Sequence, residues 1–365
     1  MLTHVAAFSP DYKTARSRFC TAAAERGCHL ESYAINQQGP DGEELAIDVA
    51  VWGAKQPQRV LILSSGLHGI EGFAGSAVQI AWLENCLPQL NLPSDLACVL
   101  IHALNPYGFA WLRRCNEENV DLNRNFLLPG ESYQGCPKDY PKINEILNPP
   151  HEPSRWEPFL LKALALILRY GNTTLKNTLP VGQYDFPKGL FFGGNSPSKT
   201  QQILKENLPG WVKGTQQILQ VDFHTGLGRK SDYLLFPVEP IGLECNQWLI
   251  NSFGANHLET WKPQGISYPI NGDMGKWCQA MFPQSNYNFL TVEFGTYPSI
   301  KVVKALRAEN CAHWWGNTES VSYQWAKQLM LEVFAPSDYQ WRSSVVAQGL
   351  HIVQRALEAM SASSN

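Results

Sequence analysis

The chain has 365 residues, 44% of them apolar, which is enough for one large α/β domain or two ordinary ones. Its net charge of −3 gives no reason to expect a nucleic acid or an anionic membrane surface as its partner. The nine cysteines are scattered without a CxxC pair, no apolar run approaches about 18 residues, and the N-terminus lacks a signal-peptide pattern, so we expect reduced thiols, no membrane span and a cytoplasmic location.

The first third of the chain alternates helical and strand-like segments. Residues 11–27 have the spacing of a helix that ends on a glycine, and residues 44–53 alternate apolar and polar side chains, as in a strand with one solvated face. Residues 59–65 form a continuous apolar run typical of a buried strand, residues 73–87 return to helical spacing, and residues 96–104 resemble a second buried strand. This alternation predicts an α/β fold with a mixed, largely parallel twisted sheet and helices on both faces.

A long segment at about 129–218 interrupts this alternation. It is rich in Pro, Gly and Tyr and contains one clear helical pattern, at residues 156–171. Short apolar strands then return at residues 218–228 and 287–296, and each ends in polar residues and glycine. Because polar strand ends occur in both halves, we expect a single domain over residues 1–365, with 129–218 as a functional insertion that narrows the cleft.

Three strand ends carry side chains suited to catalysis. His68 and Glu71 follow the first buried strand, His224 closes another, and Glu293 lies at the end of a third. The carboxyl ends of strands in an open α/β sheet meet at one edge, so these side chains are expected to converge. Two histidines and a carboxylate are a common zinc-ligand set, and the spacing of His68 and Glu71 suits one helical turn. On its own this HxxE pattern is weak, and a buried histidine beside a helix-capping glutamate is the alternative.

Five short motifs carry a resemblance to a known family. They occur in the order GLHGIEG (66–72), NPYGF (105–109), RRCNEENVDLNRNF (113–126), VDFHTGLG (221–228) and TVEFGT (291–296). The chain resembles the zinc carboxypeptidase superfamily, the carboxypeptidase A-like metallopeptidases, and is most similar to an uncharacterised bacterial branch of it. The resemblance implies a site at the carboxyl ends of the sheet strands.

The resemblance also assigns roles at the reacting centre. It implies that three side chains bind one zinc ion per chain: His68, Glu71 and His224. Glu293 corresponds to the general base that acts on the zinc-activated water and then hands its proton to the leaving amine. Arg114 corresponds to the arginine that stabilises the tetrahedral oxyanion, with Arg113 as the alternative.

Further residues are assigned to the substrate and to the support of the ligands. By the same resemblance, Asn123 and Arg124 hold a free substrate carboxylate, for which a guanidinium fork is well shaped. Asp121 corresponds to an acid that accepts a hydrogen bond from a ligating histidine, and we expect this to be His68. Tyr268 corresponds to a mobile tyrosine that closes over substrate, and an ordinary loop tyrosine is an equal alternative.

Two other polar residues near strand ends, His102 and Asp222, are expected to support the ligands or to pack in the core. Three protein ligands already leave one open position on the metal.

These assignments predict an enzyme whose partner is a small peptide or N-acyl amino acid. The first hypothesis is a zinc carboxypeptidase that cleaves an amide bond next to a free carboxylate. The alternative is an N-acyl amino acid deacylase of the aspartoacylase or succinylglutamate desuccinylase kind, which shares the scaffold. A third hypothesis is a non-catalytic binding protein with a vestigial site. The sequence leaves the substrate, the physiological metal and the oligomeric state open.

Overall fold

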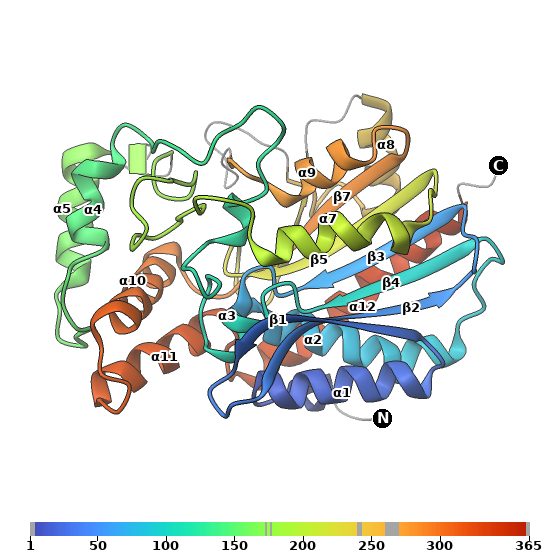
Figure 1. Cartoon of the computed structure of the whole chain (residues 1–365), viewed down its shortest axis with the longest axis horizontal. Coiled ribbons are helices and arrows are strands. Elements are labelled where there is room, and N and C mark those ends of the chain that lie inside the picture. The colour runs from blue at the N-terminus through green and yellow to red at the C-terminus, as the bar shows by residue number, and fades with distance from the viewer. Residues whose placement is uncertain (1–3, 172–173, 176, 239–242, 260–269, 363–365) are drawn as a thin grey trace.

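The computed structural model describes residues 4–171, 174–175, 177–238, 243–259 and 270–362. Its centre is a seven-stranded sheet (Figure 1). In chain order the strands are β1 (His29–Gln38), β2 (Glu44–Gly53), β3 (Arg59–Ser65), β4 (Leu96–His102), β5 (Gln217–Thr225), β6 (Tyr233–Pro237) and β7 (Asn286–Phe294).

The sheet is mixed, with a parallel centre. Across it the strands follow the order β1-β2-β4-β3-β5-β7-β6. The neighbours β4, β3, β5 and β7 run parallel to one another. At the edges, β2 is antiparallel to β4, β1 is antiparallel to β2, and β6 is antiparallel to β7. The carboxyl ends of the four parallel strands therefore lie at one edge of the sheet.

Helices cover both faces of this sheet. Alternate side chains of β3 enter two different cores: Val60 and Ile62 pack into one, and Leu61 and Leu63 into the other. The first core is closed by α7 (Lys199–Val212) and α9 (Met274–Met281). The second is closed by α1 (Tyr12–Glu25), α2 (Gly72–Ala81), α8 (Leu243–Phe253) and α12 (Tyr339–Ala362). The fold class predicted from the sequence, a mixed and largely parallel sheet with helices on both faces, is confirmed.

The remaining elements lie beside the carboxyl edge of the sheet or in its connections. Figure 1 shows four helices grouped at one end of the molecule: α4 (Tyr140–Leu147), α5 (Phe159–Tyr170), α10 (Ser299–Trp315) and α11 (Val321–Phe334). The other short elements are the helix α3 (Pro106–Ala110) and the π-turn η3 (Trp82–Cys86). The 3-10 turns are η1 (His4–Ala7), η2 (Gly69–Glu71), η4 (Leu87–Gln89) and η5 (Leu122–Arg124).

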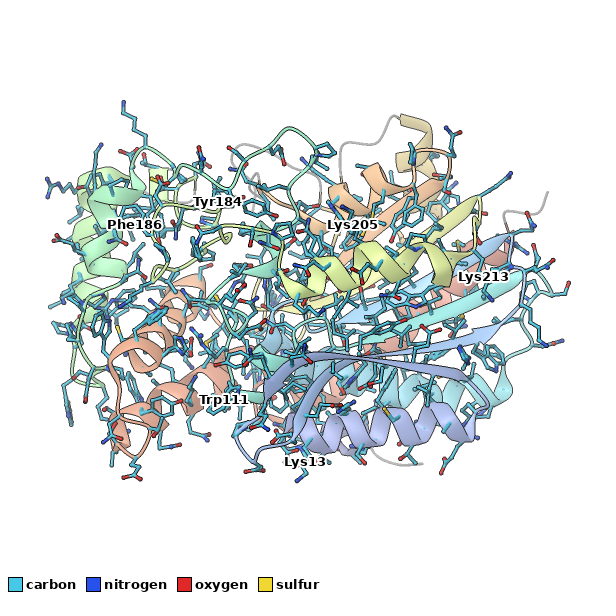
Figure 2. The ribbon with its side chains drawn as sticks, in the orientation of Figure 1. Lys13, Trp111, Tyr184, Phe186, Lys205 and Lys213 are labelled. Atoms are coloured by element: carbon cyan, nitrogen blue, oxygen red, sulfur yellow. The ribbon has the colours of Figure 1, made fainter. Side chains whose placement is uncertain are left out.

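The segment at about 129–218 contains more regular structure than its sequence predicts. Within its described residues lie the helices α4, α5 and α7, where one was predicted. Helix α7 contains Pro209 and α4 begins with a proline in its first turn, and both features obscured the helical pattern. Phe186, labelled in Figure 2, places its ring 5.3 Å from that of Tyr140 on α4. The segment thus forms its own small core, while α7 returns to the sheet.

The predicted solvated face of residues 44–53 is wrong. Residues Leu45 to Ala50 are all buried, because α1 covers the face that was expected to be wet. Asp48, the polar residue that suggested this face, accepts hydrogen bonds from Arg16 on α1, at 2.7 Å from Nε. No described helix combines the length and apolar composition needed to cross a membrane.

Candidate metal centre and catalytic site

The turn after β3 is shaped by two glycines. Gly66 has a φ of +69°, the left-handed region that glycine adopts without strain. At Gly69, a Cβ atom would lie 2.2 Å from the carbonyl carbon of Gly108, so only glycine lets η2 pack this closely on α3. The turn is held by the amides of Gly69 and Ile70, which donate to the carbonyls of Arg114 and Arg113 at 3.1 and 2.8 Å. The predicted helical turn between His68 and Glu71 is therefore a 3-10 turn.

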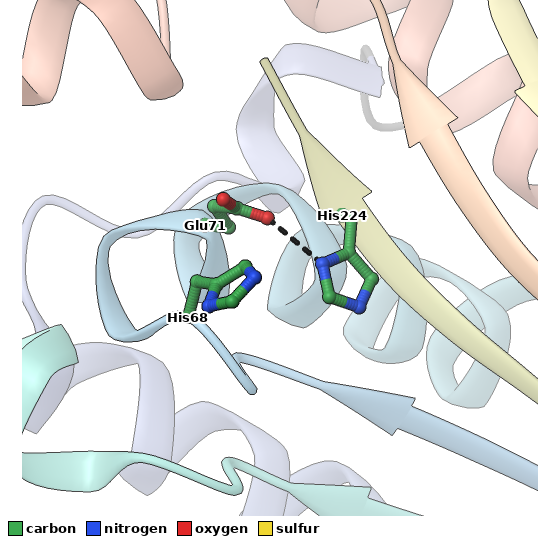
Figure 3. Close-up of side chains that lie close together, drawn as sticks. All are labelled: His68, Glu71 and His224. Carbon is green, nitrogen blue, oxygen red and sulfur yellow. Dashed lines mark ion pairs between the residues drawn. The ribbon is translucent and has the colours of Figure 1, made fainter. Parts of the chain in front are cut away.

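This turn brings three potential ligands together, as Figure 3 shows. His68, Glu71 and His224 offer ligand atoms that all lie within 4.8 Å of one another, and all three residues are buried. Glu71 Oε2 lies 3.2 Å from His224 Nδ1 and accepts the amide of Thr225 at 3.0 Å. Two imidazole nitrogens and one carboxylate are a donor set that suits zinc, so these residues fit the metal that the sequence implies.

A chain of hydrogen bonds holds the imidazole ring of His224 through its Nε2 atom. Its Nε2 lies 2.5 Å from Asp222 Oδ2, and Ser64 Oγ donates to Asp222 Oδ1 at 2.7 Å. Gln220 Nε2 donates to Ser64 Oγ at 2.8 Å, and Tyr287 Oη donates to Gln220 Oε1. Burial alone would lower the pKa of His224, but the Asp222 and Glu71 carboxylates raise it well above its usual value.

His68 has the opposite electrostatic surroundings. Burial lowers its pKa well below the usual value, and the nearby positive charges of Arg114 and His224 act in the same direction. Its Nδ1 faces Asp121 Oδ1 at 3.4 Å, and its Nε2 lies 2.7 Å from Arg114 Nη2. A neutral imidazole is the form that binds a metal, and a metal at Nε2 would take the place of the hydrogen bond that this atom accepts from Arg114. Asp121 thus lies beside the histidine for which the sequence proposed it.

Arg114 points into the site and Arg113 points away from it. Arg114 Nε donates to Asp121 Oδ2 at 2.8 Å, and its Nη1 lies 3.4 Å from Glu71 Oε1. Arg113 is fully buried and forms an ion pair of 2.8 Å with Glu309 on α10. Of the two arginines considered from the sequence, Arg114 is therefore the one beside the ligands.

Glu293 stands next to His224 on the neighbouring strand. The two residues are directly paired in the register of β5 and β7. Among the described residues, the buried Glu293 Oε2 has no hydrogen-bond partner. Burial, reinforced by the Glu71 carboxylate, raises the pKa of Glu293 to about 8, although His224 and Arg114 oppose the shift. A carboxylate in this setting costs free energy to keep unpaired, which is typical of a functional group.

The two residues proposed to hold a substrate carboxylate are engaged with main-chain groups. Asn123 Oδ1 accepts the amide of Met274 at 3.2 Å. Arg124 is completely buried, and its Nε and Nη1 donate to the carbonyls of Pro180 and Asn123 at 2.8 and 2.7 Å. Its Nη2 also donates to Pro180, and Tyr184 (Figure 2) donates to the Arg124 carbonyl at 2.9 Å. Tyr268, the proposed mobile tyrosine, lies outside the described residues.

The two polar residues expected to play supporting roles separate in space. Asp222 contacts His224, whereas His102 stacks on Phe19 with ring centroids 4.6 Å apart and lies 2.8 Å from Ser76 Oγ. Sequence reasoning did not identify Ser64, Gln220 or Tyr287 as part of the site. One signal was available: Gln220, Asp222 and His224 alternate on one face of an otherwise apolar strand.

The sequence matches the family described as "Protein of unknown function (DUF2817)" over residues 8–348, and the chain belongs to this family. A search of curated proteins gave no significant match.

Among solved structures, the chain is similar to metallocarboxypeptidases and to an amidase. Carboxypeptidase A from Helicoverpa armigera has 13% identity and a TM-score of 0.47, with 93% of this chain and 74% of that one covered. Bovine thrombin-activatable fibrinolysis inhibitor has 11% identity and a TM-score of 0.45, with 95% and 98% covered. Murein-tripeptide amidase MpaA from Escherichia coli O157 has 18% identity and a TM-score of 0.35, with 81% and 97% covered. At these values none of the three assigns an activity to this chain.

Proposed function

We propose that this protein is a zinc-dependent hydrolase that cleaves an amide bond next to a free carboxylate, an activity of the carboxypeptidase type. The observation that carries the proposal is the convergence of His68, Glu71 and His224 within 4.8 Å of one another, with Glu293 paired in register beside His224. The five motifs that resemble the zinc carboxypeptidase superfamily contain all four of these residues.

The ligand cluster accounts for the metal. His68, Glu71 and His224 would hold a zinc ion, which when bound acts as a Lewis acid on a carbonyl and lowers the pKa of a water toward about 7. Asp222 fixes the ring of His224 through Nε2, so that Nδ1 faces the cluster beside Glu71.

Glu293 is suited to moving the proton. In its carboxylate form, the buried Oε2, which lacks a partner among the described residues, can accept a proton from the attacking water. Protonated Glu293 then donates that proton to the leaving amine. Arg114 carries positive charge beside Glu71 and Asp121, where it would stabilise the negative charge that develops on the substrate oxygen.

Binding of the substrate carboxylate would require a change in the hydrogen bonds of Arg124. Arg124 donates to the Pro180 carbonyl, so a carboxylate must take the place of that oxygen to reach the guanidinium. Asn123 lies next to it in η5 and would supply a side-chain amide. Segment 129–218, which contains Pro180, is thereby proposed to restrict access within a single catalytic domain.

The test is a product analysis with a matched pair of variants. Zinc-loaded protein is incubated with peptides and N-acyl amino acids, and products are identified by mass. We expect cleavage next to a free carboxylate. Glu293→Gln should keep its metal and lose roughly two to four orders of magnitude in kcat, the usual contribution of a positioned base. Glu358→Gln, at an exposed glutamate on α12, should leave kcat unchanged.

Each other outcome has a clear meaning. Near-normal kcat in a metallated Glu293→Gln protein would refute the mechanism. Cleavage of N-acyl amino acids alone would identify the deacylase alternative. No metal uptake and no product from either substrate class would favour the binding protein.

A further inference from the structure

Helix α5 exposes an apolar face to solvent. Its inner side is buried through Phe159, Ala163 and Leu166, and Leu166 packs with α4. The outer side carries no acidic residue, and its large side chains are 37% to 79% exposed: Leu160, Leu161, Leu164, Ile167 and Leu168. A helix face of this apolar character is normally buried, and twelve residues are too few to cross a bilayer.

This exposure is concentrated in one short segment. Eleven large apolar side chains are exposed among the described residues, and six of them lie between Trp156 and Leu168. Trp156 alone is 87% exposed. The five on α5 leave on the order of 500 Å² of exposed surface, at the upper end of the ~300–600 Å² of the largest patch on a typical monomer and more than half of the ~800 Å² that each partner contributes to a standard interface.

The face is presented by a firmly attached helix. Glu157, just before α5, forms ion pairs with Arg307 on α10 and, at 2.5 Å, with Lys162. Arg307 Nε also donates to the Ile146 carbonyl at 2.6 Å, and its guanidinium lies 5.5 Å from the Phe159 ring centroid. The buried contacts therefore fix the helix, and the outer face is available without rearrangement.

We propose that this outer face binds a second copy of the chain, forming a two-fold symmetric dimer in which the two α5 helices cross antiparallel near Leu164. Leu161, Leu164 and Leu168 follow the three- and four-residue spacing by which one helix packs into the grooves of another.

The charges at the edges of the face agree with this arrangement. Lys162 is paired with Glu157 of its own chain, a carboxylate that it shares with Arg307, and Arg169 lies near the C-terminal end of the helix. Antiparallel packing places the two copies of Arg169 at opposite ends of the interface. A lipid surface fits less well, since helices that lie on membranes pair their apolar face with a strongly charged one, which α5 lacks.

The proposal is tested by sedimentation analysis at protein concentrations from about 1 to about 100 µM. This range brackets micromolar dissociation constants. Wild-type protein should have twice the 40.9 kDa of one chain. The double variant Leu161→Glu/Leu168→Glu should dissociate at least about a hundredfold more readily, because it would bury unpaired charges. The control Val321→Glu changes a side chain that is 77% exposed on α11 and should leave the dimer intact.

A complementation experiment tests the two-fold geometry. Leu164→Glu and Leu164→Lys should each be monomeric, and an equimolar mixture should restore dimers because the two substituted positions face each other. Circular dichroism confirms that each variant is folded. A wild-type monomer at all concentrations, a dimer that survives the double substitution, or a monomer that instead co-sediments with anionic phospholipid vesicles would overturn the proposal.

Discussion

Asp222 is shared by two hydrogen-bond donors, one at each carboxylate oxygen. His224 Nε2 lies against Oδ2, and Ser64 Oγ donates to Oδ1. The carboxylate therefore links a potential metal ligand to the buried chain that continues through Gln220. Since Asp222 does not face the ligand cluster itself, its effect on a metal would be transmitted through the orientation of His224.

Replacing Asp222 by asparagine should weaken metal binding without abolishing the fold. The amide keeps one oxygen, so either His224 or Ser64 loses its hydrogen-bond acceptor. Losing a hydrogen bond that orients a metal-binding histidine typically lowers metal affinity about 10–100-fold. Competition with a chromogenic chelator measures the change. His224→Ala should lose the metal altogether, and Asp41→Asn, at an exposed site between β1 and β2, should behave like wild type. Unaltered affinity in Asp222→Asn would show that the contact does not serve the metal.

Arg124 allows the carboxylate hypothesis to be tested directly. Amidation of the substrate terminus removes the charge with which the guanidinium would pair, and a charge-assisted hydrogen bond contributes about 1.5–3 kcal/mol. We expect kcat/KM to fall at least about tenfold on amidation, since a tenfold change corresponds to about 1.4 kcal/mol, and we expect Arg124→Ala to erase the difference. If Arg124 only braces the Pro180 carbonyl, Arg124→Ala will lower stability and leave the preference for free acid intact.

At the scale of single residues, the sequence predicted the potential ligands and Glu293 better than the hydrogen-bonded residues that support His224. His68 and Glu71 follow a strand that is recognisable as an apolar run, and His224 and Glu293 lie at the ends of two others, so their convergence could be inferred. The bonds among Ser64, Gln220 and Tyr287 depend on the register of three strands, which no local pattern fixes.

At the scale of elements, the turn η2 depends on a close approach between two backbones. A methyl group at Gly69 would collide with Gly108 on α3, where main-chain atoms cannot rotate away as a side chain can. Gly69→Ala should therefore lower the free energy of unfolding by about 1–3 kcal/mol, the usual cost of overpacking, and weaken metal binding. Urea unfolding measures the stability.

Gly210 supplies the matched control. It lies inside α7, and a Cβ there would meet nothing within 4 Å. Gly210→Ala should leave stability unchanged or raise it by about 0.4–1 kcal/mol, because alanine loses less conformational entropy in a helix. Equal stability of the two variants would show that the approach of η2 to α3 is not tight.

Each of the elements that sequence patterns missed has a physical cause. Strand β1 is an edge strand in which most side chains are at least partly exposed, so it lacks the apolar run that marked β3 and β4. Helix α7 contains a proline that normally ends a helix. Apolar sequence patterns therefore predicted the central strands of the sheet. The edge strand β1 and the inserted helix α7 could be recognised only in the tertiary structure.

At the scale of the whole molecule, a buried charge cluster joins the helical end to the site. Glu309 on α10 binds Arg113 at 2.8 Å and Lys327 of α11 at 2.7 Å. Lys327 Nζ also donates to the Trp111 carbonyl at 2.9 Å. Arg113 itself precedes Arg114, so the cluster fixes the backbone that carries the site arginine. Burial would raise the pKa of Glu309, but Arg113 and Lys327 lower it to about 2.

This cluster should make stability depend on acid pH. Because the folded pKa of Glu309 lies below its unfolded value of about 4.3, its contribution is present above pH ~4.3 and is lost as pH falls toward 2. Glu309→Gln should cost about 3–5 kcal/mol at pH 7, since it leaves buried cations unpaired, and the difference from wild type should shrink at pH 3. Denaturant titrations at both pH values test this, and a difference independent of pH would contradict it.

The position of Glu293 on β7 also determines when the proposed base is made during synthesis of the chain. The potential ligands at positions 68, 71 and 224 leave the ribosome before this strand does, and β7 must pair with β5 before Glu293 stands beside His224. Chains are made from the N-terminus, and pairing between distant strands is slow. All three potential ligands are therefore made before the proposed base, and a nascent chain without β7 lacks that base. Under the proposed function, it could not hydrolyse its own unfinished segments or its neighbours while it is still being made.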